Sequence, residues 1–212
     1  CVIPDGMEEK FAVLPEEYSH LYLAIDGKLA AVICIHDPIR QEAFPVINSL
    51  KRAGISKVVM MTGDSERTAR AVAAQIGVDE YYSEVLPEDK AGFVEREKAA
   101  GRKVIMIGDG INDSPALSAA DVGIAISDGA EIAREIADVT IGADNLYEIV
   151  TLKAISNGLM KRIHKNYRSI ILINAGLIAL GVTGIIQPTT SALLHNTSTL
   201  VIGLKSMQNL ID

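Results

Sequence analysis

Acidic residues gather at a glycine-rich turn near the middle of the chain. The apolar stretch Lys103–Ile107 ends in Gly108-Asp109-Gly110, and Asn112-Asp113 follow just before Ser114-Pro115. Open α/β sheets bind their ligands at the carboxyl ends of the strands. Two carboxylates on such a turn can hold Mg²⁺ beside a phosphate, because Mg²⁺ prefers hard oxygen ligands and keeps several waters. The alternative is a plain turn, with Asp113 as a helix N-cap and Pro115 near the first helical position.

Two further signals precede this motif, each at the end of an expected strand or the start of an expected helix. Thr62-Gly63-Asp64 follows the apolar run Lys57–Met61, and Lys90 stands at the start of a helix after Pro87. Taken singly, Thr62 could be only a helix cap, and Lys90 could be a solvated helix lysine. The order of the three signals along the chain is therefore more informative than any one of them.

Apolar runs and turn residues predict a β-hairpin followed by alternating strands and helices. Tyr22–Ile25 and Leu29–Ile35 flank Asp26-Gly27, a dipeptide typical of tight hairpin turns. Such alternation builds βαβ units and hence a mostly parallel α/β sheet. The expected helices are one that opens at 36–40 and runs to about 52, and those at 65–76, 87–100 and 130–137; the expected strands are 57–61, 81–82, 103–107, 121–126 and 139–141.

Composition limits the class of protein. The 212 residues carry a formal net charge of −7, which argues against a nucleic-acid-binding domain. The two cysteines, Cys1 and Cys34, form no metal-spaced pair and imply no disulfide framework, as in a reducing compartment. The first residue is Cys rather than Met, and nothing near it resembles a signal peptide, so we expect the chain to start inside a longer protein.

The character of the sequence changes after Asn145. A helical segment rich in Lys and Arg precedes the uncharged run Ile170–Ile186, which is close to the roughly 20 residues that span a bilayer. Gln187-Pro188 forms a turn before a second uncharged stretch, Thr189–Leu204. This pattern predicts a transmembrane helical hairpin with both ends cytoplasmic, since basic residues flank it. Gly176, Gly181 and Gly184 are expected to allow close helix packing. The alternative is a buried helical hairpin of a soluble domain.

The order of Thr62-Gly63-Asp64, Lys90 and the Gly108–Leu117 motif resembles the haloacid-dehalogenase-like superfamily, and more specifically the phosphorylation domain of P-type ATPases. The following helix and hairpin resemble the C-terminal end of the heavy-metal-transporting branch. The resemblance covers the chain from about Leu21 onward. It implies a Rossmann-like parallel sheet, Mg²⁺ as cofactor and ATP as substrate.

The resemblance also implies a role for each motif residue. Asp109 would be a Mg²⁺ ligand, and Asn112 and Asp113 would complete or orient the magnesium site. Lys90 would neutralise charge in the phosphoryl-transfer transition state. The other catalytic residues would bind phosphoryl oxygens at a helix N-terminus. These residues are Thr62, Gly63 and Asp64.

One departure from the family is large. P-type ATPases form an aspartyl-phosphate on an Asp-Lys-Thr-Gly-Thr motif, and the chain contains no such motif. Asp37 follows a strand but lacks that context, since Pro38 and Ile39 come next. The nucleophile, its core strand and most of the ATP base pocket are therefore expected upstream, in a missing N-terminal part of the same pump. The sheet would be incomplete, and the chain alone would be inactive.

Polar residues within the two apolar stretches form a second candidate site. Intramembrane His and Asn are costly in lipid and suggest an ion path. His and neighbouring amide or hydroxyl oxygens could bind a transition-metal cation; the alternative is interhelical hydrogen bonding by Ser, Thr and Asn. The candidate ligands are Asn174, His195, Asn196 and Ser198.

The sequence thus predicts the C-terminal part of a heavy-metal P-type ATPase, which is a multi-pass membrane protein. We expect the protein to lie in the plasma membrane of a prokaryote, with its catalytic domain in the cytoplasm. The alternatives are a soluble Mg²⁺-dependent phosphatase of the same superfamily, or a non-catalytic membrane-anchored regulatory fragment. The expected parts are a nucleotide-domain remnant at 1–36, part of the phosphorylation domain at 37–144, a linking helix at 145–168 and two transmembrane helices at 169–207.

Overall fold

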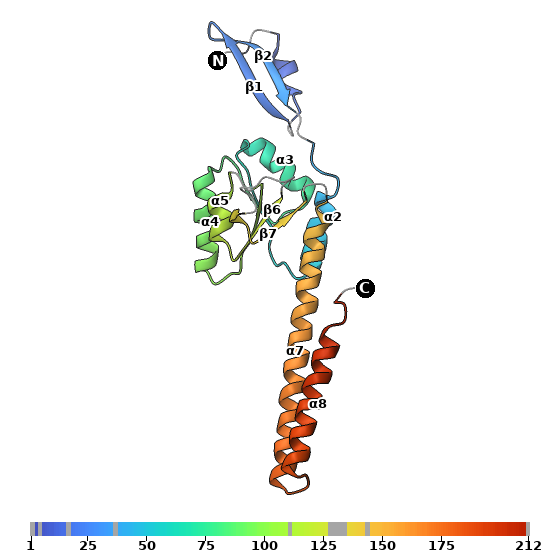
Figure 1. Ribbon diagram of the computed structural model, residues 1–212. Coiled ribbons are helices and arrows are strands. Elements are labelled where there is room, and N and C mark those ends of the chain that lie inside the picture. The colour runs from blue at the N-terminus through green and yellow to red at the C-terminus, as the bar shows by residue number, and fades with distance from the viewer. Residues whose placement is uncertain are drawn as a thin grey trace. The chain divides into compact units, whose positions relative to one another are not determined.

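The computed structural model describes residues 3, 6–15, 18–35, 38–109, 112–126, 135–142 and 145–210. The chain divides into two compact units, Cys1–Val150 and Thr151–Asp212. The described strands all belong to the first unit, and the second is helical (Figure 1). Most of the expected helix at 130–137 lies outside the described residues, as do Asp37, Gly110 and Ile111. The finer domain boundaries expected from the sequence stay predictions.

A short helix and the predicted β-hairpin open the first unit. Helix α1 (Glu8–Ala12) precedes strands β1 (Ser19–Ile25) and β2 (Lys28–Ile35), which pair antiparallel. Asp26 and Gly27 both have positive φ, 49° and 76°. Positive φ at both central residues defines the turn whose twist suits a two-residue hairpin, so the prediction from Asp-Gly is confirmed.

Five short parallel strands follow, in two groups. β3 (Val59–Met61) pairs with β4 (Glu80–Tyr82), and β5 (Ile105–Gly108) pairs with β6 (Val122–Ile126), which pairs with β7 (Val139–Ile141). The prediction of a mostly parallel α/β sheet is confirmed. Among the described strands, none pairs with the second edge of β3 or of β5.

Helices connect these strands, and capping residues or prolines mark where they begin or end. α3 (Glu66–Ile76) begins after Ser65, whose hydroxyl accepts a hydrogen bond from the Thr68 N–H, and ends at Gly77 in the left-handed conformation. α4 (Pro87–Ala99) has proline in its first turn, as does α5 (Ser114–Ala119) after its N-cap Asp113.

The helix expected to open at 36–40 starts later. α2 spans Ala43–Arg52, with Pro45 in its first turn. Proline lacks an N–H and clashes with the preceding turn, so a helix accepts it only near the start. Pro45 therefore explains why α2 begins at Ala43.

The core of the first unit joins both strand groups. One cluster of its buried residues comes from α4, β5 and α5, and Met61 of β3 packs against it. Gly123 of β6 has no room for a side chain, because an added Cβ would lie 2.7 Å from the Leu117 carbonyl oxygen. The buried cluster consists of Val94, Met106, Ala116 and Leu117.

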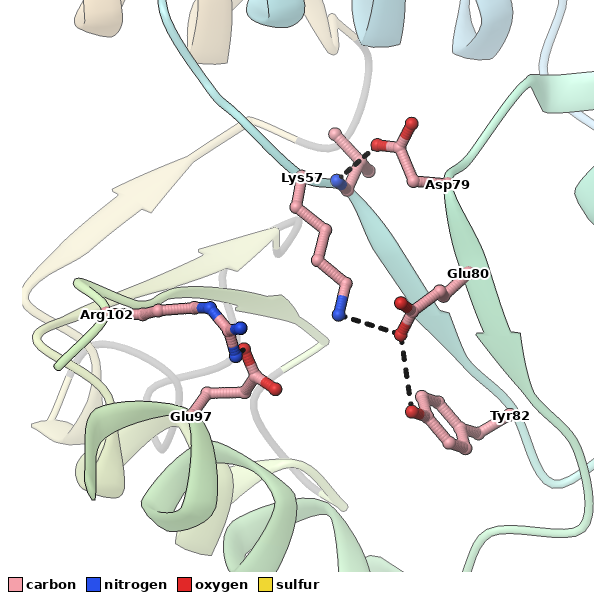
Figure 2. Close-up of polar contacts among 7 residues, drawn as sticks. Lys57, Asp79, Glu80, Tyr82, Glu97 and Arg102 are labelled. Carbon is pink, nitrogen blue, oxygen red and sulfur yellow. Dashed lines mark hydrogen bonds and ion pairs between the residues drawn. The ribbon is translucent and has the colours of Figure 1, made fainter. Parts of the chain in front are cut away.

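Polar contacts fasten the amino-terminal ends of β3 and β4 (Figure 2). Lys57 forms an ion pair of 2.8 Å with Glu80, and Asp79 accepts a hydrogen bond of 2.7 Å from the Val58 N–H. The hydrogen bond from Lys57 lowers the pKa of Glu80, and hydrogen bonds from Lys51 and Val58 lower that of Asp79. Thr62 follows β3 at the opposite end, so these contacts stabilise the strand pair away from the candidate site.

The second unit consists mainly of two long helices. The expected linking helix and first apolar stretch form one helix, α7 (Tyr147–Val182), followed by α8 (Pro188–Ser206). Gly184, which has φ 75°, lies just beyond the last residue of α7, Val182. The Gly184 N–H donates to the Gly181 carbonyl and the Ile185 N–H to the Leu180 carbonyl. This pairing is the glycine-based helix stop known as the Schellman motif, and it ends the helix before the apolar run ends at Ile186.

No helix among the described residues combines the length and the apolar character that a membrane crossing requires. The two transmembrane helices predicted at 169–207 are therefore not seen as such. An added Cβ at Gly176, Gly181 or Gly184 would meet no described atom within 4 Å, and the packing role predicted for these glycines stays a prediction.

Candidate functional site

The Thr62–Asp64 loop closes on itself at the carboxyl end of β3. The Thr62 hydroxyl donates a hydrogen bond of 2.7 Å to Asp64 Oδ2 and accepts one of 3.1 Å from the Asp64 N–H. Gly63 and Asp64 are exposed, and α3 begins directly after Ser65. The loop thus presents backbone N–H groups and a hydroxyl at a helix N-terminus, a setting that favours an anion.

Backbone hydrogen bonds fix this loop to the segment after β4. The Thr62 N–H donates to the Tyr82 carbonyl, the Val85 N–H donates to the Thr62 carbonyl and the Glu84 N–H donates to the Asp64 carbonyl, all within 2.9–3.0 Å. Leu86 then forms the N-cap of α4. The phosphate-loop candidate and the helix that carries Lys90 are therefore held together by the backbone.

Glu66 strengthens the same attachment, and the sequence analysis gave it no role. Its carboxylate accepts hydrogen bonds from the Ser83 hydroxyl at 2.6 Å and the Tyr81 hydroxyl at 2.8 Å. These two bonds lower the pKa of Glu66, and the bond to Glu66 raises that of Tyr81. The sequence offered one signal for this role, the position of Glu66 directly after Thr-Gly-Asp-Ser. Its hydrogen-bond partners, however, lie on and just after another strand, β4.

Lys90 and Asp113 form a largely buried ion pair. Lys90 Nζ donates to Asp113 Oδ1 at 2.8 Å, with 16% and 12% of the two side chains exposed. The pair joins the first turn of α4 to the N-cap of α5. The structure therefore brings together two of the residues expected from the sequence, and Lys90 is not the solvated lysine of the alternative reading.

Gly108 makes room for this pair. A Cβ added at Gly108 would lie 2.7 Å from Asp113 Cβ, closer than real side chains approach. Asp109 follows at the end of β5 and is exposed, as is Asn112. The motif thus places one carboxylate inside against Lys90 and one outside at the strand end.

This donor set suits Mg²⁺, which binds through one or two carboxylates and fills its remaining positions with water and phosphate oxygens. Asp109 is the exposed carboxylate of the motif, whereas Asp113 is buried and its Oδ1 accepts a hydrogen bond from Lys90. Among the described residues, no group of three His, Cys, Asp or Glu side chains could enclose a metal.

A second polar contact joins the two helices of the second unit. His195 Nδ1 lies 2.8 Å from Asn174 Oδ1. The amide oxygen only accepts hydrogen bonds, so Nδ1 is the donor in this contact. The Ser198 hydroxyl donates to the His195 carbonyl at 2.8 Å and is thus turned to its own helix. Asn196 is exposed on α8.

Comparisons with known proteins identify the family of this chain. Residues 5–121 match the haloacid dehalogenase-like hydrolase family. The chain is 40% identical over 183 residues to the manganese-exporting P-type ATPase of Mycobacterium tuberculosis (strain ATCC 25618 / H37Rv), a match that covers 86% of this chain and 26% of that protein. It is 44% identical over 176 residues to copper-transporting ATPase 1 of Rhizobium meliloti (strain 1021), covering 83% and 21%.

A solved structure extends the similarity to both units. The crystal structure of a zinc-transporting PIB-type ATPase in the E2.Pi state matches with a TM-score of 0.75 and 28% identity, covering 96% of this chain and 33% of that one. The chain spans about a quarter of the length of the relatives named above. It belongs to the haloacid dehalogenase-like hydrolases and is a homologue of the heavy-metal P-type ATPases.

Proposed function

We propose that this chain forms the C-terminal part of an ATP-driven heavy-metal cation transporter that works through an aspartyl-phosphate. One observation carries the proposal: the largely buried Lys90–Asp113 pair lies against Gly108, and backbone hydrogen bonds of the residues before α4, the helix of Lys90, connect that helix to the Thr62 loop. The homology to metal-exporting P-type ATPases supports the reaction class.

The Thr62 loop would bind the phosphoryl group. Its hydroxyl now donates to the Asp64 carboxylate, and an arriving phosphoryl oxygen can accept that hydrogen bond instead. The N–H groups of Gly63 and Asp64 would add donors at the positive end of α3. Each contact would stabilise negative charge on the transferring group.

Lys90 would balance the charge of the phosphoryl group. An ammonium carries three donors, and Asp113 takes one of them in the structure. The other two can donate to phosphoryl oxygens while Asp113 keeps the side chain aimed. Asp109 would hold Mg²⁺, which supplies positive charge beside the same oxygens, and Asn112 would help to orient that group.

The nucleophile would come from outside these 212 residues, which contain no Asp-Lys-Thr-Gly-Thr motif. We propose that its strand pairs with the second edges of β3 and β5, which no other described strand occupies. A parallel strand there would end between Thr62 and Asp109. The chain alone would then form no phosphoenzyme, and most of the ATP base pocket would also lie elsewhere.

The test is a chimera in which this chain replaces the C-terminal quarter of the manganese-exporting relative. Purified with Mg²⁺ and labelled ATP, the chimera should form an acid-stable, hydroxylamine-labile phosphoenzyme. Asp109→Ala should abolish it, whereas Asp89→Asn, which removes an exposed acid beside Lys90, should not. Phosphoenzyme on the isolated chain, or full activity in Asp109→Ala, would contradict the proposal.

The transported cation would bind at the His195–Asn174 contact. Metal-binding histidines usually donate their second ring N–H to an oxygen, which fixes the tautomer. Asn174 would play this orienting part, leaving His195 Nε2 as the ligand, with Asn196 and Ser198 as further candidate oxygens. A transition-metal ion is the proposed cargo, since imidazole suits such ions; the relatives are named for manganese, zinc and copper.

We also propose that the α7–α8 hairpin contacts lipid in the membrane and that the first unit is cytoplasmic. Large apolar side chains are exposed along both helices, among them Leu172, Ile178, Leu193 and Leu200 at 62–67%. The finding on helix length and apolarity opposes this proposal, and fractionation decides between them. Retention of the expressed chain in the membrane pellet after carbonate washing is expected, and release into the wash would refute membrane insertion.

A further inference from the structure

The guanidinium of Arg162 on α7 donates hydrogen bonds to backbone carbonyls at and just after the end of α8. Nη1 donates to the carbonyl oxygens of Ser206, at 2.9 Å, and of Gln208, and Nη2 donates to that of Asn209 at 2.7 Å. Ser206 is the last residue of α8. The last carbonyls of a helix have no partner within it and carry negative partial charge, so a planar cation with several donors suits this position.

A second contact lies one turn along α7. Asn166 Nδ2 donates to the Ser206 hydroxyl at 2.7 Å, and that hydroxyl donates to the Ile202 carbonyl at 2.8 Å. On the other side of Arg162, Gly158 approaches Leu210, whose carbonyl oxygen would lie 3.6 Å from an added Cβ. The end of α8 is thus held along three successive turns of α7.

These contacts are in register with the His195–Asn174 contact. At the ordinary helical rise, α7 advances about 18 Å from Arg162 to Asn174, and α8 runs back about 16 Å from Ser206 to His195. The two paths nearly match, so one axial alignment satisfies both ends. A slip of one turn, about 5.4 Å, would break both sets of contacts.

We infer that Arg162 is a positioning residue that sets the axial register of α7 and α8 and thereby holds Asn174 against His195. Its relevance to transport rests on the proposed cation site, but the register itself does not. The planar fork of the guanidinium divides the three carbonyls between two nitrogens, Nη1 and Nη2, whereas a lysine carries all its donors on one nitrogen. Arg162 would therefore act on the imidazole tautomer of His195 through the packing of the helices.

The test reads that tautomer directly. In the complete chain in detergent micelles at about pH 8, above the ordinary histidine pKa of about 6.5, ¹⁵N NMR of the histidine rings, assigned with His195→Gln, should show the ring proton of His195 on Nδ1 rather than on Nε2. Arg162→Gln should lose this signature and show averaged ring nitrogens. Lys161→Gln removes the same charge from the adjacent position and should retain it.

Circular dichroism shows whether each variant keeps its helices. A helical Arg162→Gln variant with an unchanged His195 signature would overturn the inference, as would equal loss in Lys161→Gln. If Arg162→Gln fails to fold, Arg162→Lys decides instead: loss of the signature supports the fork, and retention overturns it.

Zn²⁺ titration separates this inference from the cation site. Zn²⁺ affinity should fall about tenfold in Arg162→Gln, the usual cost of losing an orienting partner. Failure of the unmodified chain to bind Zn²⁺ would refute the proposed cation site, while the tautomer result would still decide the role of Arg162.

Discussion

Lys90 Nζ lies 2.8 Å from Asp113 Oδ1, with both side chains more than four-fifths covered. The two residues come from different helices, and Gly108 leaves the space that Asp113 occupies. A pair so placed keeps the ammonium fixed before any ligand arrives. It therefore links the stability of the first unit to the candidate chemistry.

Removing one member of this pair should destabilise the chain strongly. Asp113→Ala would leave the Lys90 ammonium covered and unpaired, which costs about 3 kcal/mol of unfolding free energy. Urea denaturation followed by circular dichroism measures it. The double variant Lys90→Met with Asp113→Ala should lose less than the sum of the two single changes, and strict additivity would show that the pair is not coupled.

Gly108→Ala should lower the unfolding free energy by about 1–3 kcal/mol, the usual cost of forcing atoms into a filled space. Its new methyl group would meet Asp113 Cβ at 2.7 Å. Gly92→Ala is the matched control, because an added Cβ there would approach the Arg96 guanidinium no closer than 3.9 Å. Gly92 lies within α4, so alanine should stabilise it by about 0.5–1 kcal/mol. Equal effects at both sites would refute the packing argument.

Acid should weaken the fold partly through Asp121. The Val104 N–H and then Lys103 lower the pKa of its carboxyl. Its stabilising contribution is therefore present above the unfolded pKa, about 3.9, and is lost as the pH falls through the lower folded pKa. Asp121→Asn should flatten the decline of Tm below about pH 4. Parallel Tm curves for the two proteins would exclude this contribution.

Leu117→Ala should cost about 2–5 kcal/mol, the range for removing a fully buried leucine side chain. Leu117 is 1% exposed within the core cluster. Leu86→Ala tests a leucine that is 56% exposed and should cost much less. Chemical denaturation of both variants provides the comparison.

The sequence predicted elements that depend on local signals. Asp26-Gly27 fixed the hairpin turn, Ser65 and Gly77 bounded α3, and apolar runs located the parallel strands. These features follow from turn, capping and burial patterns within a few residues.

Contacts between distant residues could not be predicted in this way. The Lys90–Asp113 pair, the Glu66 attachment and the Arg162 contacts each join separate elements, and no spacing rule links them. The end of α7 was missed for another reason: Gly184 was assigned to packing, whereas its backbone stops the helix. The roles of Thr62, Asp109 and His195 stay predictions, as does the metal.

The second edges of β3 and β5 have a practical consequence. Each presents backbone N–H and C=O groups that no other described strand satisfies. Such edges recruit strands from other molecules and promote aggregation. We expect the isolated chain to self-associate as its concentration rises. Its solubility should therefore increase when another strand pairs with the second edges of β3 and β5.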